Sequence, residues 1–375
     1  MDGDRSTVPA FLNVERSLGG NRWRPRLTNE RSALAIAQHL GVPDALGRVL
    51  AARGVQVGEA EAFLDPKLRD LLPDPSHLLD MDIAVERIVE AINGGEKIGV
   101  FADYDVDGAC SASLLVRFFS ALGRNLHVYV PDRIAEGYGP NTPALLKLKE
   151  QGVSLVITVD CGTTAFAPLS DAADAGLDVL VIDHHVAQPR LPDAVAIVNP
   201  NRLDETSPVG QLCAAGMVFM LIIAVNRALR DAFWYDEGHG EPNLIDMLDL
   251  VALATVADVV PLTGVNRALV RQGLAVMSRR QNPGIAALAD VSRLDETPEA
   301  WHLGFMLGPR VNAGGRVGEA GLGVKLLTTT DVDEASGIAT RLDQYNSERR
   351  EIEAAVLDAA MAQAEQQVEA EAPLI

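Results

Sequence analysis

Apolar runs and helix-like stretches alternate along the chain from residue 97 onward. The predicted strands are 97–101, 126–130, 153–159, 178–182 and one near Ala196. The predicted helices between them are 109–122, 141–151 and 163–175. The strands are almost continuous Val, Ile and Leu, which is typical of strands buried on both faces. Such strands alternating with helices predict an α/β fold in which helices flank a parallel sheet.

The segments on either side of this region are predicted to be mainly helical. Residues 1–95 would form a helical N-terminal extension, interrupted at Gly41-Val42-Pro43. Residues 96–330 would form the main domain, in which 307–318 is predicted to be a glycine-rich loop. Residues 331–375 are predicted to be one long polar helix.

Three aspartates follow the first predicted strand. Asp103, Asp105 and Asp107 are spaced two apart, and Gly108 after them permits a turn. Alternate side chains of an extended segment face the same side, so the three would lie together at the carboxyl end of a strand, where open α/β sheets bind ligands. Like charges held this close repel each other unless cations lie between them. A solvated acidic turn would explain this stretch equally well, and a calcium loop begins in the same way but needs a glutamate near Phe118.

Two more predicted strand ends carry residues of the same kind. Strand 153–159 leads into Asp160-Cys161-Gly162, and strand 178–182 leads into Asp183-His184-His185. Because parallel strands open at one edge of the sheet, we expect Asp160 to approach the first group of acids. Many oxygens, one or two imidazole nitrogens and no thiolate favour Mn²⁺ or Mg²⁺, and Asp183 could orient an imidazole. An ordinary helix cap by Thr163 is the alternative explanation of the Asp160 turn.

Asp258 is a single acid inside the otherwise apolar run 253–262. A buried carboxylate without a partner costs several kcal/mol. Asp258 is therefore expected to have a cation as its partner, and a surface turn before Pro261 is the alternative.

The composition limits the partners of the chain. It carries 52 acidic and 32 basic residues and a net charge of −20, which argues against broad, nonspecific adhesion to nucleic acid or to an anionic membrane. Nucleic acid in a local cleft is not excluded. Three cysteines without a close pair fit a reducing cytoplasm. The longest apolar run, 212–225, is shorter than a membrane span, so no membrane partner is expected.

The strand-end motifs resemble those of the DHH phosphoesterase superfamily in their order and approximate spacing. Within it, the chain is similar to the RecJ single-strand-specific exonucleases from about residue 30 onward. The stretches that carry this similarity are Phe63 to Pro66, Leu72 to Pro75, Phe101 to Gly108, Ile134 to Pro140 and Leu307 to Gly318. Shorter DHH enzymes usually have a histidine where Phe101 stands, and here Asp103 would compensate for it.

The resemblance implies a two-metal phosphodiesterase that degrades single-stranded DNA in the 5′→3′ direction during recombination and repair. The implied ligands of the two Mn²⁺ or Mg²⁺ ions are Asp103, Asp105, Asp107, Asp160, His184 and Asp258. The implied catalytic residues are Asp183 and His185, with His185 at the scissile phosphate or the leaving group. The implied phosphate contacts are Arg133, Arg310, Asn312 and Arg316, with Arg133 at the 5′ end. A single-strand-binding protein and a helicase are the implied protein partners.

RecJ enzymes normally continue into a second DHH-associated domain and an OB-fold. The resemblance therefore implies that the chain is truncated, with 331–375 as the helix that connects to the missing part. Two other functions stay open at this point. One is a phosphodiesterase for small molecules or oligonucleotides, or a pyrophosphatase, of the same superfamily; the other is a non-catalytic scaffold in DNA replication.

Overall fold

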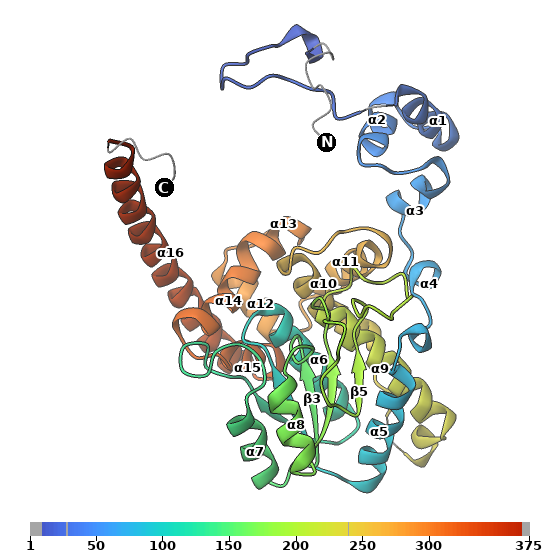
Figure 1. Ribbon diagram of the computed structural model, residues 1–375. Coiled ribbons are helices and arrows are strands. Elements are labelled where there is room, and N and C mark those ends of the chain that lie inside the picture. Colours follow the sequence, from blue (N-terminus) through green and yellow to red (C-terminus); the bar gives the residue numbers. More distant parts are fainter. Residues whose placement is uncertain (1–9, 28, 239, 370–375) are drawn as a thin grey trace. The chain divides into compact units, whose positions relative to one another are not determined.

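The computed structural model describes residues 10–27, 29–238 and 240–369 (Figure 1). The chain divides into two compact units, Met1–Asp70 and Leu71–Ile375. This division is not the one at residue 95 expected from the sequence, and the predicted boundaries at 95/96 and 330/331 stay predictions.

The first unit is a small helical unit. Its elements are η1 (Phe11–Asn13), α1 (Glu30–Leu40), α2 (Asp44–Ala52), η2 (Val57–Glu59) and α3 (Ala60–Leu64), and α4 (Leu68–Leu71) follows at its end. The Asn29 side chain caps α1, and Gly41 ends it with a left-handed φ of 64°. Pro43 then precedes α2, which explains the predicted interruption. Ile36 and Leu50 belong to the buried cluster of this unit.

The second unit is built on a parallel five-stranded sheet. Its strands are β1 (Ile98–Ala102), β2 (His127–Tyr129), β3 (Leu155–Val159), β4 (Asp178–Ile182) and β5 (Ala196–Val198). They lie in the order β2-β1-β3-β4-β5, and every pair is parallel. The predicted parallel α/β fold is thus confirmed. The chain turns in opposite directions on either side of β1 and β3, which makes this pair the switch point of the sheet.

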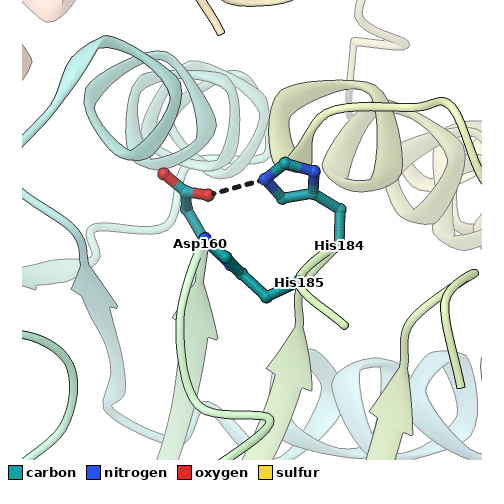
Figure 2. A group of neighbouring side chains, drawn as sticks. All are labelled: Asp160, His184 and His185. Carbon is teal, nitrogen blue, oxygen red and sulfur yellow. Dashed lines mark ion pairs between the residues drawn. The ribbon is translucent and has the colours of Figure 1, made fainter. Parts of the chain in front are cut away.

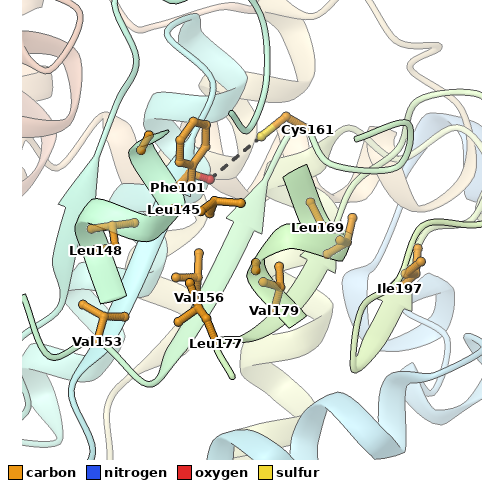
Figure 3. Packing of buried hydrophobic residues seen from close by; sticks show 13 residues of the cluster. Phe101, Leu145, Leu148, Val153, Val156, Cys161, Leu169, Leu177, Val179 and Ile197 are labelled. Atoms are coloured by element: carbon orange, nitrogen blue, oxygen red, sulfur yellow. Dashed lines mark hydrogen bonds between the residues drawn. The ribbon is translucent and has the colours of Figure 1, made fainter. Parts of the chain in front are cut away.

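Helices cover both faces of this sheet. On one face, α7 (Thr142–Glu150) and α8 (Phe166–Asp174) pack on a buried cluster that includes Phe101, Val156 and Val179 (Figure 3). On the other face lie α5 (Met81–Gly94), α6 (Val106–Ala121) and α9 (Ala214–Asp231). All residues of β1 and β3 are buried, which accounts for their continuous apolar sequence.

The remaining helices of this unit are η3 (Pro75–His77), η4 (Trp234–Glu237), η5 (Leu244–Met247), α10 (Leu248–Ala257), α11 (Gly264–Met277), α12 (Pro283–Val291), α13 (Ala300–His302), η6 (Leu303–Leu307), α14 (Gly308–Val317), α15 (Leu322–Thr328) and α16 (Val332–Glu369). They pack on α6 or α9, as α10 and α15 do, or on one another, as α14 and α16 do. The long polar helix predicted over 331–375 is present as α16 as far as Glu369, and residues 370–375 of that prediction lie outside the described residues. Among the described residues, none of the helices combines the length and the apolar character that crossing a membrane requires.

The prediction of a glycine-rich loop over 307–318 is wrong, because most of this stretch forms α14. Its glycines do not form a turn; they leave space for neighbouring parts of the chain to pack closely against the helix. A Cβ atom at Gly315 would overlap the carbonyl oxygen of Tyr104, and one at Gly318 would overlap the ring of Tyr345. The glycines therefore let the helix approach neighbours that any side chain would push away.

Candidate metal centre

Three aspartates form a row across neighbouring strands. Asp103, Asp160 and Asp183 are the first residues after β1, β3 and β4. The backbone N–H of each donates to the last residue of the next strand, at Val159, Ile182 and Val198 respectively. The row therefore lies at the carboxyl edge of the sheet and includes the switch point between β1 and β3, where open α/β sheets bind ligands.

Asp105 and Asp107 belong to the start of α6. The Asp105 side chain caps the helix by accepting from the N–H groups of Asp107 at 2.8 Å and Gly108 at 3.0 Å. The Asp107 carboxylate accepts from Ala214 at 2.6 Å and Ala215 at 2.8 Å, the first two residues of α9. Gly108 is needed here because a Cβ would overlap the carbonyl oxygen of Asp103, not because of a turn.

His184 lies between carboxylates from three different elements. Its Nε2 atom is 3.3 Å from Asp160 Oδ1, 3.7 Å from Asp107 Oδ2 and 3.8 Å from Asp258 Oδ2 (Figure 2 shows the Asp160 contact). Asp258 directly follows α10 and stays partly exposed. Burial lowers the pKa of His184, so its imidazole is held in the neutral form that binds metal ions.

His185 is held by Asp183. The Nδ1 atom of His185 lies 2.7 Å from Asp183 Oδ1, which also accepts from the backbone N–H of His184. Asp183 Oδ2 accepts from the N–H of Thr163 at 3.1 Å. Burial alone would raise the pKa of Asp183, but its hydrogen bond with His185 and the other donors outweigh this and lower the pKa to about 2. The same hydrogen bond raises the pKa of His185.

We call the acids and histidines at this edge of the sheet the cluster. The pKa values of its other acids are shifted upward, unlike that of Asp183: Asp103, Asp107, Asp160 and Asp258. Burial, followed by repulsion from neighbouring carboxylates, raises the pKa of Asp103 to about 7 and that of Asp107 to about 8, and it raises the pKa of Asp160. It also raises the pKa of Asp258 to about 6. Asp103 Oδ1 is buried and has no hydrogen-bond partner among the described residues. This oxygen is therefore available to a cation.

The donor atoms fit divalent cations. Within each of three groups, the donor atoms lie within 4.8 Å of one another: Asp103, Asp105 and Asp160; Asp107, His184 and Asp258; and Asp160, His184 and His185. Asp160 and His184 each occur in two of these groups, as ligands of neighbouring ions would. The donors are carboxylate oxygens and imidazole nitrogens without thiolate, which suits Mn²⁺ or Mg²⁺. All eight predicted metal and catalytic residues are therefore brought together, while their individual roles stay predictions.

The four predicted phosphate contacts lie in two different situations. The guanidinium of Arg133 lies over the ring of Tyr104, 5.3 Å from its centroid, and Arg316 is exposed near the end of α14. In contrast, Arg310 donates to Asp343 and to the carbonyl of Met306. Asn312 accepts from the N–H of Val106 at 3.0 Å and so fixes α14 to the start of α6. The phosphate contacts of all four stay predictions.

Two residues that support the cluster, Tyr138 and Asn199, were not predicted to have a role. The Tyr138 hydroxyl donates to the carbonyl of Asp160 at 3.1 Å and lies 3.4 Å from the ring nitrogens of His185. Asn199 Nδ2 donates to the carbonyl of His185 at 2.9 Å. Asn199 directly follows β5, so the same strand-end argument could have found it. Tyr138 lies in a loop, and only its place in a RecJ-like motif marked it.

Comparisons with known proteins agree with this geometry. Residues 97–255 match the DHH family, N-terminal domain. The chain is 41% identical over 316 residues to the single-stranded-DNA-specific exonuclease RecJ of Salmonella typhimurium, covering 83% of this chain and 54% of that protein. A crystal structure of exonuclease RecJ bound to manganese matches with a TM-score of 0.69 and 34% identity, covering 78% of this chain and 71% of that one. RecJ of Thermus thermophilus in complex with Mn²⁺ matches with a TM-score of 0.75 and 31% identity, covering 90% and 47%. The chain spans about half the length of the curated relatives it matches.

Proposed function

Since the chain belongs to the RecJ family within the DHH family, we propose that it is a metal-dependent phosphodiesterase that degrades single-stranded DNA from the 5′ end to mononucleotides. The observation that carries this proposal is the cluster of carboxylates and His184, in which one oxygen of Asp103 is buried and has no hydrogen-bond partner among the described residues. Such a set is stable at neutral pH when cations balance its charge.

Two Mn²⁺ or Mg²⁺ ions are proposed to be held by the carboxylates and His184. The ligands would be Asp103, Asp105, Asp107, Asp160, His184 and Asp258, with Asp160 shared between the ions. Such ions, when bound, neutralise the phosphate and clamp the attacking and leaving oxygens of an in-line displacement. Asp107 would hold its ligand position firmly, because its carboxylate is fixed by two N–H groups of α9.

His185 is proposed to exchange a proton with the leaving oxygen or to contact the scissile phosphate. Asp183 Oδ1 accepts from Nδ1 of His185, so Nε2, 3.4 Å from the Tyr138 hydroxyl, is the ring nitrogen that would face a substrate. The raised pKa of His185 favours the protonated ring, which can donate a proton or attract the phosphate. The ring of Tyr138 meets that of His185 edge-on and would help to keep it in place.

Arg133 and Arg316 are proposed to hold DNA phosphates, with Arg133 at the 5′ end. Both are exposed, and neither forms an ion pair with another described residue. Guanidinium groups match phosphate oxygens in geometry as well as charge. Arg133 lies over the ring of Tyr104, which lies between Asp103 and Asp105 in the chain, so a phosphate held by Arg133 would be close to the cluster.

We also propose the protein partners of the chain and its location in the cell. A single-strand-binding protein and a helicase would supply the unpaired strand in recombination and repair. A cytoplasmic location is proposed because Cys110, Cys161 and Cys213 are free and buried, as suits a reducing compartment.

The test compares Mn²⁺-dependent release of nucleotides from single strands labelled at either end. The chain is expected to release label from the 5′ end first, and Asp160→Asn is expected to reduce the rate at least about a thousandfold. Asp249→Asn, a buried aspartate at the other end of α10, is the matched control and should keep the wild-type rate. Equal rates for Asp160→Asn and wild type would refute the proposal. Preference for pyrophosphate or dinucleotides would assign the site to a small substrate instead.

A further inference from the structure

The backbone of the two adjacent histidines is held by side chains. His184 and His185 lie in a segment without regular secondary structure, so their peptide groups have no partners in a helix or sheet. Asp183 Oδ1 accepts from the N–H of His184 at 2.7 Å and from that of His185 at 3.2 Å. On the other side, the carbonyl of His184 accepts from Asn201 Nδ2 at 2.5 Å, and the carbonyl of His185 accepts from Asn199 Nδ2 at 2.9 Å. Each histidine therefore has its own asparagine.

Asn199 is fully buried and forms hydrogen bonds through both ends of its amide. Besides the carbonyl of His185, its Nδ2 donates to the hydroxyl of Thr163 at 2.8 Å. Its Oδ1 accepts from the N–H of Asn201 at 2.8 Å and so stabilises the turn after β5. An aspartate could stabilise the same turn, but a carboxylate has no donor for the carbonyl of His185. The position therefore needs a side chain with both an acceptor and a donor, as asparagine has.

Asn201 connects the segment of His184 to the segment that leads into α9. Its Nδ2 also donates to the carbonyl of Gly210 at 3.2 Å, and its own carbonyl accepts from the N–H of Ala187 at 3.4 Å. The first residues of α9 in turn hold the carboxylate of Asp107. The donor atoms of His184 and Asp107 belong to one of the three groups within which the donors lie within 4.8 Å of one another. Asn201 therefore links the segments that carry two donors of one group.

We propose that the two asparagines are positioning residues with separate tasks: Asn201 keeps His184 in place for the cations, and Asn199 keeps His185 in place for the substrate. This inference rests on the proposed function, which gives the two histidines different roles. Both asparagines bond to the backbone of the histidines, and a fixed backbone limits the directions that each imidazole can take. Residues that orient ligands in this indirect way commonly change metal affinity or activity by about 10- to 100-fold.

The test compares Asn201→Ala and Asn199→Ser with a matched control, Asn226→Ala. Asn199→Ser keeps a side-chain oxygen for the turn but is too short to reach the histidine carbonyl. Asn226 is a buried asparagine near the C-terminal end of α9, and its amide bonds to Glu241 at 2.9 Å and to Tyr235 at 2.6 Å. Each change removes two side-chain hydrogen bonds, so each should lower the Tm of the metal-free protein by about 2–5 °C.

Calorimetry with Mn²⁺ and kinetics on a 5′-phosphorylated single strand separate the two tasks. Asn201→Ala is expected to bind Mn²⁺ about tenfold more weakly than wild type and to recover most of the wild-type kcat once Mn²⁺ is saturating. Asn199→Ser is expected to bind Mn²⁺ within about twofold of wild type, with kcat about tenfold lower and KM within about twofold. Asn226→Ala should match wild type in Mn²⁺ affinity, kcat and KM despite its lower Tm.

The histidine resonances provide a measurement that needs neither metal nor activity. In metal-free protein labelled with ¹⁵N-histidine, the Nδ1 proton of His185 is bonded to Asp183 and should give a downfield signal. Asn199→Ser is expected to shift or remove this signal, because the ring can then turn away from Asp183. Asn201→Ala should leave the signal unchanged.

Equal loss of Mn²⁺ affinity in the two variants, or no loss beyond that of Asn226→Ala in either, would overturn the separate tasks. If Asn199→Ser does not fold, the Mn²⁺ affinity of Asn201→Ala, at a partly exposed position, decides. Wild type that binds Mn²⁺ without releasing nucleotides would refute the proposed hydrolysis, whereas the calorimetry and the His185 signal would still test the two asparagines.

Discussion

At the scale of single residues, Asp160 shows how the centre is built. It has a positive φ of 61°, it is buried, and its pKa is raised by burial and by Asp107. Aspartate and asparagine tolerate a left-handed backbone better than most residues. Asp160→Asn therefore removes the charge while keeping both the shape and the backbone, which makes it the most informative substitution at the centre.

Asp249 allows a test of buried charge away from the centre. Burial raises its pKa to about 6, while Arg117 Nη1 lies 4.0 Å away. Because the folded state holds this proton more tightly than the unfolded state, the stability that it contributes is present below pH 4 and is lost as the pH rises through 6. Asp249→Asn should therefore gain stability relative to wild type between pH 4 and pH 7, by up to about 3 kcal/mol.

The measurement is urea denaturation in EDTA at pH 4, 5, 6 and 7. The contributions of other titrating groups to the free energy of unfolding are the same in both proteins, so they cancel in the difference. Asp174→Asn, an exposed residue at the end of α8, serves as control and should show a constant difference. A difference for Asp249→Asn that does not grow with pH would contradict the assignment.

Among the site residues, those at strand ends could be predicted from the sequence. Asp103, Asp160 and Asp183 follow apolar strands, and parallel pairing brings strand ends to one edge. The internal partners of Arg310 and Asn312 could not be predicted, because they depend on α16 and α6, which are distant in sequence.

At the scale of elements, α14 differs most from its prediction. Glycine was interpreted as a sign of a loop, but the close approach to Tyr104 decides the structure. Propensity is a weak prior that tertiary packing overrides. In contrast, β1, β3 and β4 were predicted to within a few residues, because their apolar runs are long, continuous and bounded by turns.

Gly315 tests whether this approach matters for the centre. A Cβ in Gly315→Ala would overlap the backbone between Asp103 and Asp105, so the variant should lose about 2 kcal/mol of unfolding free energy and part of its stabilisation by Mn²⁺. Gly337→Ala in the second turn of α16 meets no atom within 4 Å and should gain about 0.5–1 kcal/mol. Urea denaturation with and without Mn²⁺ measures both effects. If the two variants behaved alike, the role of the close approach would be disproved.

At the scale of the whole molecule, the chain combines a strongly acidic balance with a centre that gathers several of those acids. Every residue of the cluster belongs to the unit Leu71–Ile375. The alternation of strands and helices predicted this α/β unit, because local periodicity reports local burial. The limit at residue 70 was not predicted, because a division between units depends on contacts summed over the whole chain.

The central claim is that the acids and His184 are held together for divalent cations. Isothermal titration calorimetry with Mn²⁺ tests this most directly, on wild type, Asp160→Asn and the control Asp249→Asn. We predict two Mn²⁺ ions per wild-type and control chain, and at least tenfold weaker binding with fewer ions for Asp160→Asn. Binding of Mn²⁺ by Asp160→Asn with wild-type stoichiometry and affinity, or no binding by wild type, would contradict the claim.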